Sequence, residues 1–389
     1  MFFKRLDRRG FIGIALTAAG ITVLAYLLSL VLLTPMAFSG ATVSALSGRN
    51  DFTFTDLYSQ VANSRDVRAI DPDVVVINIS GTERSDVAEL LDFLTGCRQK
   101  ALGIDVVFPE PSSNPEVDGL LISAMRRLPG AVLAECVDYD GTTVTERSFI
   151  ADSLPACNAG AVNLPTNSDW GPVREFPVGY TLEDGSRLPG FAVAVASSYR
   201  PEALETLSQR GSSKETVNYV SREFEILTPR QLYDNPDAVT GKAVLIGTVD
   251  DESDLHPTPV SKAMPGVLIH AHAIATIVGG KYFHTVGNAV NWTIAFFLTF
   301  LVILFKLCVE SKAVSFWMRV VQAALLIATI WTGYSLFLDR MVVVNFAYAL
   351  LMVTFGFFAC DLWTGFKEMT APARQEIRRR YILSKNDNI

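Results

Sequence analysis

The chain has 389 residues, a net charge of −7 at pH 7 and a hydrophobic fraction of 50%. An acidic balance argues against nucleic acid as the main partner, because nucleic-acid backbones are bound by positively charged surfaces. The apolar residues are concentrated in a few long runs, which excludes an ordinary soluble globular protein.

Four apolar runs are each long enough to cross a hydrocarbon core of about 30 Å as a helix. We predict transmembrane helices over residues 11–33, 289–305, 320–338 and 341–362. The intervening parts are an N-terminus over 1–10, a large segment over 34–288, a loop over 306–319 and a tail over 363–389. The first run also has features of a signal peptide, but its apolar core exceeds the usual 7–15 residues. An uncleaved anchor is therefore favoured over a cleaved signal.

The distribution of charge predicts the orientation. Residues 1–10 carry four basic side chains and one acidic side chain, and the tail from Lys367 carries six and three. The segment over 34–288 holds 19 basic and 33 acidic side chains. Because basic flanks stay in the cytoplasm, we expect a bacterial inner-membrane protein with both termini cytoplasmic and the large segment in the periplasm. The basic run 378–380 is also suited to anionic lipid headgroups.

The large segment alternates apolar strands with helical patterns. Strands are expected over 73–79, 101–108, 131–135 and 241–247, and helices over 85–97, 116–128 and 188–199. The runs 171–180 and 222–227 are typical of antiparallel or edge strands. Nearly continuous apolar strands that alternate with helices predict an α/β fold, with a largely parallel sheet covered by helices, beside the four transmembrane α-helices.

The cysteines divide by compartment. Cys97, Cys136 and Cys157 lie in the periplasmic segment, where disulfides can form. Cys136 with Cys157 is the favoured pair, because Cys97 lies in an apparent helix. No cysteine or histidine spacing in the sequence indicates a zinc site.

All four histidines, His256, His270, His272 and His284, fall between residues 254 and 286. The stretch VLIHAHA is compatible with a metal-binding strand, but the preceding Pro265-Gly266 favours the start of a helix. Two residues apart on a helix, His270 and His272 would point about 200° from each other and could not share an ion. A pH response stays open. We expect structural roles, with this helix continuing into the second span as a mechanical joint.

A carboxylate at the end of a predicted central strand marks the candidate site. Asp105 lies toward the carboxyl end of the strand over 101–108, where open α/β sheets bind ligands. Loops that could converge there carry the rest of the predicted ligand-binding set, which is Asp105, Glu110, Asp118, Arg174, Asp254, His256 and Thr258. The alternative is that Asp105 hydrogen-bonds within a buried loop and that Arg174 pairs with an acid. We expect no catalytic residue, no metal and no cofactor.

The same residues carry a resemblance to a known family. The ordered blocks KALGIDVVFPEPSSNPEVDGLLISAMRRLPGAVLA, AGAVNLPTNSDWGPVREFPV, LPGFAVAVA and GKAVLIGTVDDESDLHPTPVSKAMPGVLIHAHAIATIV resemble the CHASE2 domain. The resemblance covers about residues 50–283 and implies an extracytoplasmic sensory module of bacterial transmembrane receptors, followed by three spans. The stretch ISGTERSDVAELLDFL lacks the aromatic residue that the family usually has after its first strand.

These observations predict a non-enzymatic sensor that detects a small molecule or an envelope signal. The residues after the last span contain no kinase or cyclase signature, so we expect a separate membrane or cytoplasmic signalling partner. The other expected partners are the lipid bilayer, a small-molecule ligand and a second copy of the chain in a homodimer. The alternative is an accessory or scaffold subunit whose periplasmic domain docks a protein of an envelope complex.

Overall fold

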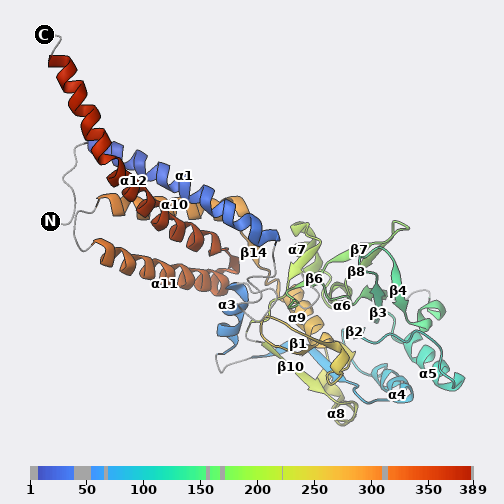
Figure 1. Cartoon of the computed structure of the whole chain (residues 1–389). Helices are drawn as coiled ribbons and strands as arrows, with labels where there is room; N and C mark the ends of the chain where they lie inside the picture. Colours follow the sequence, from blue (N-terminus) through green and yellow to red (C-terminus); the bar gives the residue numbers. More distant parts are fainter. Residues whose placement is uncertain are drawn as a thin grey trace. The chain divides into compact units, whose positions relative to one another are not determined.

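The computed structural model describes residues 8–38, 54–64, 69–154, 158–166, 171–220, 222–308 and 314–386. The chain divides into two compact units. The α/β unit is Ser47–Phe283, and the helical unit combines Met1–Leu46 with His284–Ile389. Both units are drawn in Figure 1.

The described residues of the α/β unit form a seven-stranded sheet. The strand order is β10-β1-β11-β2-β3-β4, with β5 also paired to β3. All pairs are parallel except β3 with β4. The strands are β1 (Ala69–Asn78), β2 (Ala101–Ile104), β3 (Val132–Val137), β4 (Val144–Arg147), β5 (Asn158–Ala161), β10 (Arg222–Leu227) and β11 (Ala243–Gly247). The prediction of a largely parallel sheet is confirmed.

Strand β1 shows why the sheet carries helices on both faces. Alternate residues of a strand point to opposite faces. Val74 and Val76 are buried in a core with α6 (Phe191–Tyr199) and α9 (Gly266–Gly279). Val75 and Ile77 are buried in a second core with α4 (Arg84–Leu94) and α5 (Pro115–Arg126). An apolar run without alternation therefore needs two helical layers.

Shorter elements surround this sheet. The helices are α3 (Phe54–Asn63), α7 (Ala203–Arg210) and α8 (Pro229–Asp234), with 3-10 turns at Phe149–Ser153, Pro236–Val239 and Glu252–Asp254. The two-stranded pairs are β6 (Glu175–Pro177) with β9 (Lys214–Thr216), β7 (Gly179–Thr181) with β8 (Arg187–Pro189), and β12 (Leu255–His256) with β13 (Met264–Pro265). The strand predicted over 101–108 ends at Ile104, because its outer part leads into the loop that contains Pro109 and Pro111.

The described residues of the helical unit form four long helices and one strand pair. The elements are α1 (Arg8–Phe38), β14 (His284–Thr285), α10 (Asn288–Cys308), α11 (Val314–Arg340), β15 (Val342–Val343) and α12 (Ala347–Asn386). Helices α1, α10 and α12 pack together around small side chains such as Ala18, Ala25 and Ala359. The stretches apolar and long enough to span a membrane are Arg9–Leu30, Asn288–Cys308, Val320–Arg340 and Ala347–Ala373.

Two expectations about helix ends are wrong. The helix that carries His270 does not run on into the second span. It ends at Gly279, because Gly280 adopts the left-handed conformation with φ 60° and closes the helix. The last long helix begins at Ala347 instead of Met341, because Met341 has φ 53° and the chain then forms β15.

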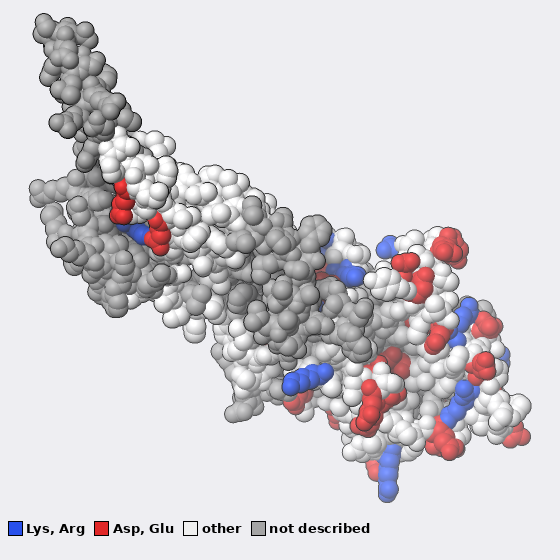
Figure 2. Space-filling model, viewed as in Figure 1, with Lys and Arg blue, Asp and Glu red and all other residues white. Residues whose placement is uncertain are grey.

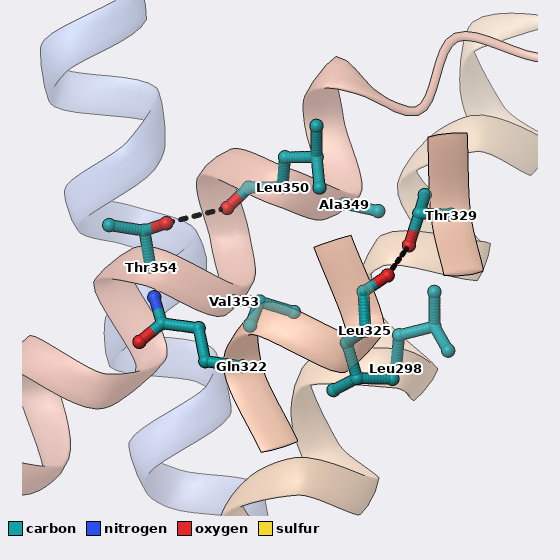
Figure 3. Close-up of a pocket in the computed structure, with 8 residues that line it drawn as sticks. All are labelled: Leu298, Gln322, Leu325, Thr329, Ala349, Leu350, Val353 and Thr354. Carbon is teal, nitrogen blue, oxygen red and sulfur yellow. Dashed lines mark hydrogen bonds between the residues drawn. The ribbon is translucent and has the colours of Figure 1, made fainter. Parts of the chain in front are cut away.

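Helices α10, α11 and α12 enclose a small cavity of about 30 Å³, which is shown in Figure 3. Its polar lining includes Thr329 and Thr354, whose hydroxyls donate to carbonyls one turn back, at Leu325 and Leu350. A volume of this size is sufficient for a water molecule. The threonine hydroxyls are thus satisfied within their own helices.

Candidate functional site

Asp105 lies at the carboxyl edge of the parallel sheet. It follows β2 directly, and its N–H donates to the Ile246 carbonyl of β11 at 2.8 Å. The side chain is half-buried. Burial of the carboxyl group, reinforced by the negative charge of Asp254, raises the pKa of Asp105 from 3.8 to about 7. Within the described part of the chain, no group donates a hydrogen bond to this carboxyl.

Asp254 reaches the same edge from the loop before α9. Its Oδ2 accepts the Gly266 N–H at 3.2 Å, and its Oδ1 lies 3.1 Å from His256 Nε2. Pro265, which precedes the helix, offers no capping side chain. Asp254 therefore caps α9 although it does not directly precede the helix. Its negative charge lies at the positive end of the helix dipole.

His270 faces this cluster from α9, but it is held neutral by its surroundings. Burial lowers the pKa of His270 to about 4, although Asp254 and a hydrogen bond to the Val162 carbonyl act in the opposite direction. Its ring packs edge-on against Phe191, with the centroids 5.1 Å apart. His270 is thus a buried neutral side chain beside the acidic cluster.

His272 lies in a different environment. Its ring packs against Tyr219 and Phe224 at 5.0 and 4.8 Å. Burial and the nearby Arg222 lower its pKa to about 3. His270 and His272 thus have different ring neighbours, and the expectation that they do not share an ion stays a prediction. No group of three or more potential metal ligands is found in the described ranges.

The sequence analysis missed two polar residues at this edge. Asn78 ends β1 and donates to Asp250 Oδ2 at 3.1 Å, and Ser80 Oγ accepts the N–H groups of Val249 and Asp250, each at 3.1 Å. These bonds fix the loop that follows β11. The available signal was the pair of polar residues, Asn78 and Ser80, at the carboxyl end of an apolar strand.

Glu110 and Asp118 lie in a separate cluster around Arg84. Arg84 Nη1 donates to the Glu110 carbonyl at 3.0 Å and to Asp118 Oδ1 at 3.1 Å. Asp118 Oδ2 accepts the Ser112 N–H at 2.7 Å. The guanidinium also lies 5.2 Å from the centre of the Phe108 ring. This cluster holds the loop between β2 and α5.

Arg174 and Thr258 make structural contacts. Arg174 forms two parallel bonds to Asp56 of α3, from Nε to Oδ1 at 2.9 Å and from Nη2 to Oδ2 at 2.7 Å. Thr258 Oγ1 accepts the Ser261 N–H at 3.0 Å within a turn. Of the predicted ligand-binding set, the structure brings together Asp105, Asp254 and His256. The ligand-binding role of each residue stays a prediction.

Cys136 of β3 lies near this site. Burial, together with the charges of Glu146 and Asp105, raises the pKa of its thiol. Its expected disulfide partner, Cys157, lies outside the described residues. The disulfide therefore stays a prediction.

Comparison with known proteins shows one relationship. The model of the CHASE2 domain matches residues 28–310, which is well over half of the chain. No curated protein and no solved structure gives a significant match. The matched range contains the whole sheet, the edge with Asp105 and Asp254, and α9. The chain therefore belongs to the CHASE2 family, whose domains are extracytoplasmic and sensory.

Proposed function

We propose that this protein is a non-enzymatic sensor of the bacterial inner membrane. Its α/β unit lies in the periplasm, detects a small molecule or envelope signal, and passes its conformational state through the helices to a separate partner protein. Family membership supports the sensory role, and the four apolar helices support the membrane anchor. On the face seen in Figure 2, charged side chains are spread over the α/β unit, whereas most of the described surface of the helical unit carries none.

The observation that carries this proposal is the carboxyl of Asp105 at the carboxyl edge of the sheet. Ligands of open α/β sheets bind outside this edge. Asp254 is close enough for its negative charge to raise the pKa of Asp105, and Asp254 also contacts His256. A site with two carboxylates favours a cationic ligand or one rich in hydrogen-bond donors. We therefore assign the ligand to this chemical class.

The chemistry of the site supports binding rather than catalysis. Asp254 is already engaged by the N-terminus of α9 and by His256, and His270 is kept neutral by burial. Among the described residues, no hydroxyl or thiol is hydrogen-bonded to the side chain of Asp105, Asp254 or His256, as activation of a nucleophile by a base requires.

Thermal unfolding of the full-length protein in mild detergent tests the site. The probes are Ca²⁺, putrescine and spermidine, added at pH 8, where Asp105 is ionised. We expect at least one probe to raise the Tm of the parent, and to raise it much less in Asp105→Asn. The exposed Asp140→Asn, which removes a charge outside the site, should respond like the parent. Equal shifts in all variants, or no shift with any probe, would contradict the proposed ligand class.

One surface feature favours a second candidate function, that of a scaffold subunit. An open groove between α4, α5 and α8 is lined by Ala88, Glu89, Asp92, Phe93, Leu120 and Tyr233. Leu120 is 58% exposed and Tyr233 40% exposed. Exposed apolar side chains that gather in one groove, unlike singly scattered ones, mark protein contacts. A stoichiometric partner that co-purifies with the parent but not with Leu120→Asp would favour the scaffold function.

A further inference from the structure

The chain leaves the α/β unit through a segment that is fixed to the core of that unit. Tyr282 and Phe283 are buried. Arg210 Nη2 donates to the Phe283 carbonyl at 2.7 Å, and its guanidinium lies 4.9 Å from the centre of the Tyr282 ring. Glu215 holds Arg210 in turn, with Nε and Oε1 2.7 Å apart. The exit segment Lys281–Phe283 is therefore held in place by the α/β unit.

The residues that follow the exit segment form a strand pair within the helical unit. Strand β14 is parallel to β15, which lies in the turn between α11 and α12. The His284 N–H donates to the Met341 carbonyl at 2.7 Å, and the Val286 N–H to the Val343 carbonyl at 2.9 Å. Met341 has φ 53°, a conformation that non-glycine residues keep only when their surroundings fix it. The turn before α12 is thus held by the residues that follow the exit segment.

Asn291 adds a side-chain bridge to the same connection. It lies in the first turn of α10 and is buried. Its Nδ2 donates to the Val286 carbonyl at 3.0 Å, and its Oδ1 accepts the Asn345 N–H at 3.3 Å. Asn345 in turn accepts the Ala347 N–H at the start of α12, at 3.1 Å. We name β14, β15 and Asn291 together the exit clamp.

We infer that the exit clamp delivers displacements of the exit segment directly to α12, in addition to the covalent route through α10. Helix α12 has 40 residues, which corresponds to about 60 Å, roughly twice the hydrocarbon thickness of a bilayer. It therefore has the length to extend past the membrane and meet a cytoplasmic partner. This inference rests on the proposed function only for the source of the displacement.

A test of the exit clamp needs variants that remove single bonds. Val286→Pro removes the N–H that donates to Val343. Thr285→Pro is the matched control, because alternate residues of a strand point their N–H groups away from the neighbouring strand. Asn291→Asp keeps the acceptor for the Asn345 N–H and loses the donor to the Val286 carbonyl. Arg210→Ala removes the side chain that donates to the Phe283 carbonyl. This substitution displaces the exit segment, so no ligand is required.

The readout is the rate at which N-ethylmaleimide modifies Met369→Cys in full-length protein whose native cysteines are replaced by serine. Met369 is 81% exposed on α12. We expect Arg210→Ala to change this rate several-fold in the parent and in Thr285→Pro, and to have little effect in Val286→Pro and Asn291→Asp. Thermal unfolding shows which variants are folded. If Val286→Pro is not folded, the test uses Asn291→Asp alone.

Two results would overturn the inference. An equal effect of Arg210→Ala in the clamp variants would show that α10 alone carries the displacement. No effect in the parent would show that the exit segment is uncoupled from α12. Both results are independent of the ligand experiment, so a failure of the proposed ligand class and a failure of the exit clamp can be told apart.

Discussion

Asp105 and two histidines give the α/β unit opposing responses to pH. Folding raises the pKa of Asp105 from 3.8 to about 7, so the folded state binds a proton that the unfolded state releases in this range. This stabilisation is fully present below pH 3.8 and is lost as the pH rises to about 7. His270 and His272 have folded pKa values near 4 and 3, below their usual 6.5. Their contribution is present above pH 6.5 and is lost on acidification.

A substitution at Asp105 removes its pH response and leaves that of the two histidines. We expect Asp105→Asn to be more stable than the parent at pH 8, because it removes a carboxylate that folding must keep charged in a buried place. The gain should be at least about 1.4 kcal/mol, which corresponds to one pKa unit. It should disappear near pH 4. Thermal unfolding of the full-length protein between pH 4 and 8 measures the difference.

The exposed Asp140→Asn is the control for this prediction, since it makes the same chemical change away from the sheet edge. Its stability should follow that of the parent at each pH. If Asp105→Asn were less stable than the parent at pH 8, Asp105 would have a structural partner, and the alternative of a loop-stabilising role would be favoured.

Residue positions such as Asp105 were predictable, but their partners were not. The predicted central strand and the tendency of open α/β sheets to bind ligands at the carboxyl ends of their strands place this acid at the ligand edge. By contrast, the pairing of Arg84 with Asp118 and of Arg174 with Asp56 joins residues far apart in sequence. Local patterns carry no information on such pairs, and this is why four of the seven predicted ligand-binding residues lie elsewhere.

At the scale of elements, α9 depends on a cap that comes from another segment. A Cβ added at Gly266 would lie 2.6 Å from Asp254 Oδ1. We therefore expect Gly266→Ala to displace the capping carboxylate and to cost about 1 kcal/mol of unfolding free energy, the usual effect of losing a cap. Thermal or urea unfolding of the full-length protein provides the measurement.

The other end of α9 offers a matched substitution. A Cβ added at Gly279 meets no atom closer than Lys281 Cγ at 3.8 Å. Since alanine is the better helix former by up to about 1 kcal/mol, Gly279→Ala should be neutral or stabilising. Equal losses in the two variants would show that the helix cannot accept a side chain at either glycine, and that Asp254 is not the cause.

Long apolar elements were predictable from sequence, and short ones were not. Strands β1, β3 and β11 and helices α4, α5 and α6 follow from period and composition. The end of α9 depended on the conformation of Gly280, and the pair β14–β15 depends on residues 284 and 342 meeting in space. The pair Gly279-Gly280 was an available signal for the end of α9, whereas the pair β14–β15 has no distinctive local pattern.

At the scale of the whole molecule, the proposed topology places both termini in the cytoplasm. In a cysteine-free background, we expect a membrane-impermeant maleimide applied to intact spheroplasts to label Asp140→Cys but not Lys385→Cys. Permeabilised cells should show labelling at both positions, which controls for reactivity. Labelling of residue 385 in intact cells would reverse the orientation and remove the basis for an extracytoplasmic sensor.

The family and the fold class could be predicted from the sequence, because both depend on apolar and glycine-rich segments that occur in a fixed order. The CHASE2 match over residues 28–310 and the parallel sheet agree with that prediction. The ligand, the partner and the route of coupling depend instead on a few side chains brought together by the fold, such as Asn291 with Val286 and Asn345. Their arrangement has no counterpart in composition.

The position of β1 in the sheet has a consequence for biogenesis. Val74 pairs with Ala243 of β11, and Val75 with Glu225 of β10. On the proposed topology, the first core strand therefore crosses the membrane long before either neighbour is available. Contacts this distant in sequence slow folding, and an apolar strand without neighbours is prone to aggregate. This strand therefore stays unpaired until the later strands have been translocated. Loss of periplasmic holding chaperones should lower the yield of folded protein and leave the stability of the folded protein unchanged.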